Sequence, residues 1–390
     1  MKHGWTYKPL GEVITVKSGY TPNASELSNE GDIPYFKVAE MNLPRNEKYL
    51  YDTPQFVITP KSTFPKGSIV FPKNGAAIGT NKKRILVTPS VVDLNTAVAI
   101  PNSEIESNFL YYIFQKIDFR LITRRGTVPT LDLKELKNIT IPVPSKDEQI
   151  SICSLLDKMN RVIEAKKEQL KELDNLAQAN FYDMFGDPVT NEKGWETKQL
   201  GDTGEIVAGS TPSTTDATNW DGNINWVTPA ELNNQLFYGS TQRKLTDKGA
   251  SGLTLMPTGT VLLSSRAPIG KLAITTEPMC CNQGFKNIVC GNKLNNIFLY
   301  YYLRLTMDIV KALGVGATFK EVSKKAISAY PIILPPLPLQ QAFAEKVEAI
   351  ERQKELINQS LREVQTLFDS RMDYWFSEED DDFGKLDKLD

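Results

Sequence analysis

Two stretches of the sequence combine glycine with lysine, arginine, asparagine and serine. The first runs from Pro72 to Arg84 (PKNGAAIGTNKKR), and the second runs from Ser264 to Lys271 (SSRAPIGK). These polar side chains are the ones that contact the phosphates and base edges of nucleic acids, and glycine allows a backbone to approach a ligand closely. The composition predicts two nucleic-acid-binding loops, with ordinary surface turns as the alternative.

A second pair of loops has the same character. Arg124-Arg125-Gly126-Thr127 corresponds to the glycine-rich stretch from Gly314 to Lys320 further along the chain. Because these loops recur at matching places in the two halves of the chain, a shared role in binding is favoured. The candidate DNA-binding residues are Lys37, Lys73, Asn74, Lys82, Lys83, Arg84, Arg124, Arg125, Thr127, Thr228, Ser264, Ser265, Arg266, Lys271, Gln283 and Lys320.

The residues needed for catalysis or metal binding do not occur in recognisable patterns. His3 is the only histidine, and it lies at a terminus that is expected to fray, so no general-base histidine is expected. The four cysteines include no C-x-x-C pair, which predicts neither a zinc site nor a disulfide framework. There is no Asp/Asn-Pro-Pro-aromatic motif of an amino-methyltransferase and no G-x-G-x-x-G loop. We therefore expect a protein without catalytic residues, metal or cofactor of its own.

Composition is that of a globular protein, and charge is unevenly distributed. The chain has 390 residues, of which 41% are apolar and 24% charged, with a net charge of −2. Residues 1–146 hold 19 basic and 13 acidic residues (+6), residues 186–337 hold 14 and 12 (+2), and the tail 377–390 holds two and seven (−5). No apolar run approaches the roughly 18 residues of a membrane span. We expect a cytoplasmic protein whose positive charge lies on two large segments.

An internal repeat organises the chain. Sequence motifs recur in the same order at offsets between 189 and 192 residues, which chance does not plausibly produce. A period of this length indicates two copies of a domain and excludes a solenoid of short repeats. The matching pairs include Trp5 and Trp195, Leu10-Gly11 and Leu200-Gly201, Thr21-Pro22 and Thr211-Pro212, Ala39-Glu40 and Ala230-Glu231, Ile78-Gly79 and Ile269-Gly270, and Phe109–Tyr112 and Phe298–Tyr301.

Each copy combines short strands with one helix and ends in a proline-rich strand. Strands are predicted at 67–71 and 260–263, helices at 108–122 and 296–313, and the proline-rich strands at 139–144 and 332–338. The expected organisation is a first domain (1–146), a long helix (147–185), a second domain (186–337), a second long helix (338–376) and an acidic tail (377–390).

Both long helices carry apolar residues at alternating spacings of four and three, which predicts the a/d seam of a coiled coil. One lysine interrupts each seam, Lys166 in the first helix and Lys354 in the second. A helix of about 39 residues is roughly 58 Å long, too long for one small domain to cover. Two unrelated amphipathic helices are the alternative. The seam residues are Ile152, Leu156, Met159, Ile163, Leu170, Leu173, Phe343, Val347, Ile350, Ile357, Leu361 and Val364.

The ordered motifs resemble the DNA-specificity subunit of type I restriction–modification systems up to about residue 376. Besides the repeated pairs above, the resemblance rests on Asn95-Thr96, Asn282-Gln283 and a Pro-x-x-x-x-Gln motif that opens each long helix (Pro144 to Gln149, Pro335 to Gln340). It implies an α/β (α+β) protein with tandem target recognition domains joined by a long antiparallel two-helix coiled coil. Each domain would recognise half of a bipartite DNA sequence.

The resemblance also implies partners. They are double-stranded DNA, two methyltransferase subunits and, through the complex, motor–nuclease subunits. Adenosylmethionine, ATP and magnesium would be bound by those subunits and not by this chain. Exposed apolar residues off the seam and aromatics near the helix ends, including Phe181, Phe185 and Phe376, suggest where other chains dock. Three alternatives stay open: a specificity subunit whose partner is a fused nuclease–methyltransferase, a coiled-coil scaffold that binds no DNA, and an independent enzyme.

Overall fold

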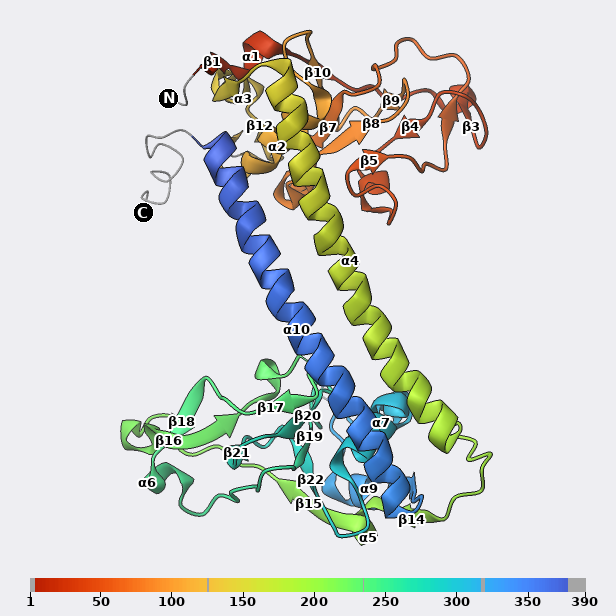
Figure 1. The fold of residues 1–390 in the computed structure, drawn as a ribbon, viewed down its shortest axis with the longest axis vertical. Coiled ribbons are helices and arrows are strands. Elements are labelled where there is room, and N and C mark those ends of the chain that lie inside the picture. Colours follow the sequence, from red (N-terminus) through yellow and green to blue (C-terminus); the bar gives the residue numbers. More distant parts are fainter. Residues whose placement is uncertain (1–3, 125, 234, 317–319, 378–390) are drawn as a thin grey trace. The chain divides into compact units, whose positions relative to one another are not determined.

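The computed structural model describes residues 4–124, 126–233, 235–316 and 320–377 (Figure 1). These residues divide into two compact units. Of the described residues, unit 1 comprises 4–124, 126–166 and 360–377, and unit 2 comprises 167–233, 235–316 and 320–359. Each unit therefore combines one domain of mixed strands and helices with parts of both long helices.

Unit 1 is built on a five-stranded sheet with the strand order β2-β10-β7-β8-β5. All neighbouring pairs are antiparallel except β5 and β8, which are parallel. Strand β7 is buried along its whole length because the four residues IVFP contribute apolar side chains to both faces of the sheet. The strands are β2 (Ile14–Ser18), β5 (Tyr49–Leu50), β7 (Ile69–Pro72), β8 (Arg84–Leu86) and β10 (Thr96–Pro101).

Smaller elements complete unit 1. Strand pairs β1–β13, β3–β6, β4–β9 and β11–β12 form four two-stranded sheets. The strands are β1 (Thr6–Pro9), β3 (Leu27–Ser28), β4 (Tyr35–Phe36), β6 (Phe56–Val57), β9 (Val91–Val92), β11 (Thr123–Arg124), β12 (Thr130–Leu131) and β13 (Thr140–Val143). The helices are α1 (Leu10–Val13), α2 (Ser107–Lys116) and α3 (Leu133–Asn138), with the 3-10 turns η1 (Ala24–Glu26), η2 (Ala39–Asn42) and η3 (Ala76–Thr80).

Unit 2 repeats this architecture. Its five-stranded sheet has the order β15-β22-β19-β20-β17, again with a single parallel pair, β17–β20, at one edge. The strands are β15 (Gly204–Ala208), β17 (Phe237–Tyr238), β19 (Val261–Leu263), β20 (Leu272–Thr275) and β22 (Lys286–Cys290). The same topology in both units confirms the tandem α/β fold that the sequence repeat predicts.

A three-stranded sheet, β18-β16-β21, lies beside the main sheet of unit 2, and β14 pairs with β23 as β1 pairs with β13. The strands are β14 (Thr197–Gln199), β16 (Trp220–Val227), β18 (Arg243–Leu245), β21 (Met279–Cys281) and β23 (Pro331–Ile333). The helices are α5 (Leu200–Thr203), α6 (Asp247–Ala250), α7 (Asn296–Leu305), α8 (Met307–Ala312) and α9 (Lys324–Ser328), with the 3-10 turns η4 (Ala217–Asn219) and η5 (Pro229–Glu231).

The domain helices are shorter than the periodicity predicts. The helix expected at 108–122 ends at Lys116 because Ile117 adopts extended backbone angles. The helix expected at 296–313 is divided into α7 and α8 at Thr306, whose backbone leaves the helical region. The hydroxyl of Thr306 donates to the carbonyl of Tyr302 at 2.8 Å, a local bond of the kind that bends helices.

The long helices α4 (Lys146–Phe185) and α10 (Leu337–Phe376) are each continuous over 40 residues. Every predicted seam position in both helices is buried or half-buried, whereas most positions between them are exposed. In unit 2 the helices run antiparallel, because Asp174 pairs with Lys354 and Phe181 packs on Phe343. The seam lysine Lys354 is held by Asp174 at 2.9 Å and Glu351 at 2.7 Å.

Aromatic residues near the helix ends anchor the helices to their domains. Phe181 and Phe185 are fully buried in the core of unit 2, where Phe181 stacks on Phe298 of α7 with ring centroids 5.6 Å apart. Phe376 packs on Phe109 of α2 in unit 1, with centroids 5.1 Å apart. The suggestion that these three residues form a docking surface is wrong, because they are already covered by their own domains.

No helix among the described residues combines the length and apolarity required to cross a membrane. Among the same residues, no group of three or more histidine, cysteine, aspartate or glutamate side chains is arranged to bind a metal ion.

Candidate nucleic-acid interface

In unit 1 the two predicted basic loops lie side by side. The first connects β7 to β8 through η3, and the second is the β11–β12 hairpin. The backbone N–H of Gly75 donates to the carbonyl of Pro129 at 2.8 Å, and that of Leu131 donates to the carbonyl of Lys73 at 2.9 Å. These bonds join two loops that are about 50 residues apart in sequence into one surface.

Unit 2 joins its loops in the same way. Arg266, in the loop between β19 and β20, forms an antiparallel bridge with Glu321, and the N–H of Val322 donates to the carbonyl of Ser265 at 2.9 Å. Residues 317–319, within the glycine-rich stretch, lie outside the described residues, as does the predicted contact residue Arg125. Lys320 and Thr127 are exposed.

In each unit, a lysine at the end of the loop between β7 and β8, or between β19 and β20, contacts a 3-10 turn of the same unit. In unit 1 the ammonium of Lys82 donates to the side chain of Asn42, in η2. In unit 2 the ammonium of Lys271 donates to the carbonyl of Pro229 at 2.8 Å, in η5. Arg84 pairs with Val70 and Ala273 pairs with Leu262 at matching places in the two sheets. Lys82 and Lys271, each two residues earlier, therefore occupy equivalent positions.

An acidic side chain organises each of these turns. Glu40 accepts the backbone N–H of Lys37 at 2.7 Å, and Glu231 accepts that of Thr228 at 2.8 Å. Lys37 and Thr228 are therefore equivalent positions that begin the two turns, although their side chains differ in charge. The candidate residues predicted from the sequence do not include Glu40 and Glu231. The repeated Ala-Glu pair in the sequence was the signal that could have identified them as structural.

In unit 2, Arg266 belongs to a small ionic cluster. Its Nε donates to Glu321 at 2.9 Å, and the same carboxylate accepts Lys286 at 3.1 Å. Partial burial opposes ionisation of Glu321, but hydrogen bonds from Lys286 and Arg266 lower the pKa of this carboxyl below its usual value. Among the described residues, the partner of Arg266 is Glu321 through Nε, so the terminal nitrogens of the guanidinium are the groups to consider for a ligand.

Lys83 is the predicted contact residue whose placement contradicts its proposed role. It is 1% exposed, and its ammonium donates to the carbonyl of Ile117 and to Asn81, both at 2.7 Å. The ammonium also lies 4.3 Å from the ring centroid of Phe119. Burial lowers the pKa of Lys83 to about 7. The prediction that Lys83 contacts DNA is wrong, because its ammonium is enclosed between the first loop and the segment after α2.

Other predicted residues have mainly structural partners. Ser264 and Ser265 are buried, so their hydroxyls bond the carbonyls of Pro268 and Gly284 and are not displayed at the surface. Arg84 is half-buried and donates to the carbonyls of Lys83 and Met41. The remaining positions keep polar groups near the surface: Lys73 (bonded to Ser18), Asn74, Arg124 (paired with Asp132) and Gln283 (bonded to Thr211).

The motif pairing of Asn95-Thr96 with Asn282-Gln283 needs a correction. Asp93 accepts the backbone N–H of Asn95 at 2.8 Å, just as Asn282 accepts that of Gly284 at 2.9 Å. A side chain added to Gly19 would meet the carbonyl of Asp93 at 2.3 Å, and one added to Gly209 would meet that of Asn282 at 2.2 Å. The structural equivalent of Asn282 is therefore Asp93, and the apparent match was shifted by two residues.

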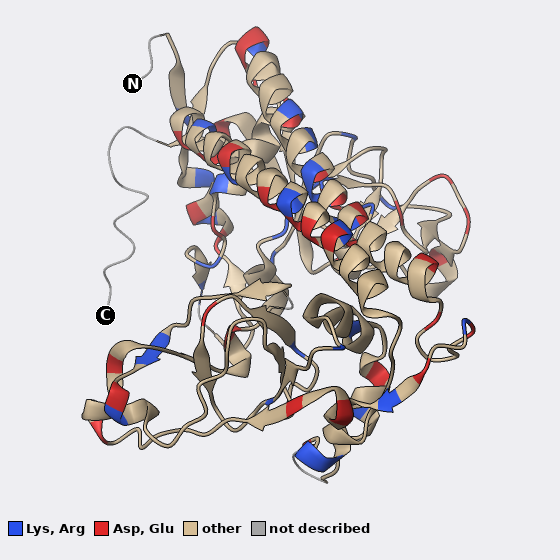
Figure 2. Cartoon of the chain, turned by 60° about the horizontal axis from the view of Figure 1, so that its bottom comes forward, with Lys and Arg blue, Asp and Glu red and all other residues tan. Residues whose placement is uncertain are grey.

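Basic and acidic residues alternate along much of the chain that the structure describes. Figure 2 shows basic and acidic residues intermixed along both long helices, with further basic residues on the loops of each domain. The arrangement can contact a polyanion through separate lysines and arginines, each held in place by a neighbouring polar group.

Comparison with known proteins relates nearly the whole chain to one family. A family model described as "Type I restriction modification DNA specificity domain" matches residues 2–175 and again residues 192–366. The two matched segments correspond to the two copies of the repeat.

Two proteins of Methanocaldococcus jannaschii are among the similar sequences. The type I restriction enzyme MjaIX specificity subunit of Methanocaldococcus jannaschii is 34% identical over 185 residues, which cover 44% of this chain and 43% of that protein. The putative MjaX specificity subunit of the same organism is 25% identical over 307 residues, 70% of each chain. The chain thus spans less than half the length of the first relative.

Solved structures show the same fold over nearly the full chain. The S subunit of a type I restriction–modification system from M. genitalium has a TM-score of 0.59 at 15% identity, and the match covers 96% of this chain and 97% of that one. A structure described as concerning complex assembly and conformational transition of the type I R-M system has a TM-score of 0.60 at 18% identity, with the same coverage.

Proposed function

Because this chain belongs to the type I restriction–modification DNA specificity family, we propose that it directs a restriction–modification complex to a bipartite DNA target. Each unit would recognise one half of that target. Membership of the family supports the role in DNA targeting, and the duplication supports the division into half-sites.

One observation carries the proposal. In both units the same surface consists of two joined loops and a 3-10 turn. The side chains on this surface differ between the units. Lys37, Asn74 and Lys82 in unit 1 occupy the places of Thr228, Arg266 and Lys271 in unit 2. A shared scaffold with different polar groups is what recognition of two different half-sites requires, because base edges are distinguished by the donors and acceptors that face them.

The polar groups divide into two roles. Lys82 and Lys271 are point charges at the loop ends, and we assign them to phosphates, which position the protein without reading sequence. Arg266 is held through Nε by Glu321, which leaves its terminal nitrogens to donate two parallel hydrogen bonds to the O6 and N7 atoms of guanine. We therefore assign base reading in the second half-site to Arg266.

Catalysis is assigned to partner subunits. We propose that two methyltransferase subunits bind this chain, that motor–nuclease subunits join through the complex, and that those subunits bind adenosylmethionine, ATP and magnesium. The complex would act in the cytoplasm. Apolar residues on the open faces of both helices support docking, since Leu155, Val162, Leu176 and Leu356 are between 40% and 67% exposed.

Co-purification with candidate methyltransferases, followed by mapping of methylated bases in host DNA, tests the proposal. The expected result is methylation at a split sequence, with two methyltransferases per chain in the mass of the complex. Methyl transfer by the isolated chain, or binding to duplex DNA that does not weaken with salt, would contradict it. A single methyltransferase at saturation would contradict the stoichiometry alone.

A further inference from the structure

Arg243 is an exposed cation that the sequence patterns did not single out. It lies on β18, an edge strand of the sheet β18-β16-β21. Its guanidinium carbon lies 3.5 Å from the ring centroid of Trp220 and 5.4 Å from that of Trp226. Over the part of the chain that the structure describes, no carboxylate forms an ion pair with this guanidinium.

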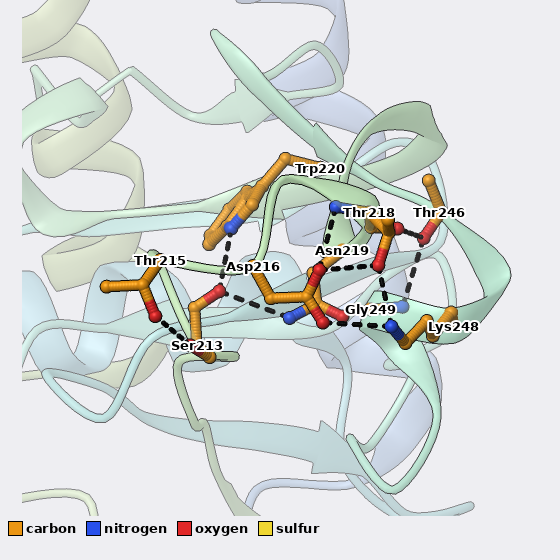
Figure 3. Close-up of polar contacts among 9 residues, drawn as sticks. All are labelled: Ser213, Thr215, Asp216, Thr218, Asn219, Trp220, Thr246, Lys248 and Gly249. Carbon is orange, nitrogen blue, oxygen red and sulfur yellow. Dashed lines mark hydrogen bonds and ion pairs between the residues drawn. The ribbon is translucent and has the colours of Figure 1, made fainter.

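The tryptophan platform beneath Arg243 is held rigidly. The two rings pack edge to face with centroids 5.0 Å apart. Figure 3 shows that the indole N–H of Trp220 donates to the carbonyl of Ser213, at 3.1 Å, and that Asn219 donates to the same carbonyl.

An ion pair in the same network closes the loop before β16. Asp216 pairs with Lys248 of α6 at 2.8 Å and accepts both the backbone N–H and the hydroxyl of Thr218 (Figure 3). These bonds fix the loop that carries Trp220. The orientation of the ring, and with it the position of Arg243, is therefore set before any ligand binds.

Strand pairing places Arg243 where unit 1 has Gln55. Trp226 pairs with Arg243 across the antiparallel strands β16 and β18, and the N–H of Tyr35 donates to the carbonyl of Gln55 at 2.9 Å. In both units a threonine two residues earlier donates its hydroxyl to the carbonyl of this position. The hydroxyl of Thr241 donates to the carbonyl of Arg243 at 2.7 Å, and that of Thr53 donates to the carbonyl of Gln55 at 3.3 Å.

The two units place a cation over the same aromatic position from different points in the sequence. In unit 1 the cation is Lys37, whose ammonium lies 5.4 Å from the ring of Tyr35 and donates to Gln55 at 2.5 Å. In unit 2 the position of Lys37 holds the neutral Thr228, and Arg243 brings its guanidinium to 5.4 Å from the equivalent ring, Trp226. Unit 2 therefore has its positive charge at Arg243, the position of Gln55, whereas unit 1 has it at Lys37, the position of Thr228.

We propose that Arg243 contacts a backbone phosphate of duplex DNA and is the counterpart in unit 2 of Lys37. This inference rests on the proposed function. Stacking on an indole occupies one face of the guanidinium and leaves its N–H groups, which lie in the plane of the group, free to bind a phosphate in a fork.

The test measures binding of the full-length chain to two 30-base-pair duplexes of unrelated sequence at several salt concentrations. Replacing Arg243 with glutamine should lower affinity and reduce the slope of log K against log salt by about 0.9, the value for one lost phosphate contact. The matched control is Arg352→Gln, which removes an exposed arginine from α10 and should leave both quantities unchanged. Arg243→Lys should keep the slope because it keeps the charge.

The outcomes separate the inference from the function on which it rests. Wild-type protein that binds no duplex in a salt-dependent way contradicts the proposed function itself. Normal wild-type binding with an unchanged slope in Arg243→Gln contradicts the inference alone. A loss confined to one DNA sequence also contradicts it, since that would make Arg243 a base reader. Thermal unfolding of each variant verifies that a loss of binding does not come from loss of the fold.

Discussion

Gln340 makes the same three hydrogen bonds in unit 2 that Gln149 makes in unit 1. Both side chains are fully buried, and each amide donates to two backbone carbonyls and accepts one backbone N–H. Each glutamine thereby ties the first turn of a long helix to the segment that precedes the domain helix. The partners are Pro144, Glu104 and Glu106 for Gln149, and Pro335, Lys293 and Asn295 for Gln340.

Replacing Gln340 with leucine should destabilise unit 2. The change leaves the N–H of Asn295 and two carbonyls without their partner, and an unsatisfied buried group costs roughly 1–3 kcal/mol. Denaturant unfolding measures the loss. The neighbouring Gln341→Leu variant is the control, because Gln341 is exposed and its replacement should change the free energy of unfolding little. Equal stability of the two variants would show that the buried amide does not anchor the helix.

Lys83 should make stability depend on pH. Its pKa is about 7 in the folded protein and 10.5 in the unfolded chain, so between these values the unfolded chain holds more protons. The free energy of unfolding should therefore rise from pH 7 to pH 9.5, by no more than about 1.4 kcal/mol per pH unit. Lys83→Met should remove this rise, whereas Lys82→Met should keep it. Parallel curves for wild type and Lys83→Met would exclude the effect.

Replacing Arg266 should change base preference, whereas replacing Lys271 should change overall affinity for DNA. Arg266→Ala should reduce the preference for the correct base in one half-site by roughly 1–3 kcal/mol, the value of a bidentate pair. Lys271→Gln should weaken binding to all duplexes alike, because a phosphate contact carries no sequence information. Competition between target and random duplexes measures both. If Arg266→Ala weakens the two duplexes equally, its assignment to base reading fails.

Exchange of a whole domain should alter half of the target. Replacing residues 1–146 with the corresponding domain of another specificity subunit should change one half-site and leave the other intact, because each domain has its own sheet, core and loops. Methylation mapping in cells that carry the hybrid gives the answer. A hybrid that changes both halves together would show that the domains do not read independently.

The sequence predicted the features that depend on repetition and periodicity. The duplication, the mixed domain type and the paired long helices follow from motif order and from the spacing of apolar residues such as Leu156 and Val347, which recur over many turns. The domain helix at 108–122 was predicted too long, since nothing in its periodicity reports the extended backbone at Ile117.

The candidate site was harder to predict because side-chain access depends on tertiary contacts. In the sequence, Lys83 is a basic residue between Lys82 and Arg84, so nothing distinguishes it from a surface cation. Its burial becomes evident from the tertiary contacts of its ammonium with the ring of Phe119 and the carbonyl of Ile117. Arg243 was missed for the opposite reason. Its role depends on strand pairing with Trp226 and on a substitution at Thr228, which no single stretch of sequence contains.

The pairing of each domain's first strand with its last has a consequence for inheritance. Strand β1 pairs with β13, and β14 pairs with β23, so each domain begins and ends at one small sheet directly before a long helix. A recombination event in the gene with crossovers at these strands would exchange everything between them and preserve the start of the helix. New target sequences could then arise by shuffling existing domains, without a series of point mutations that each had to preserve the fold.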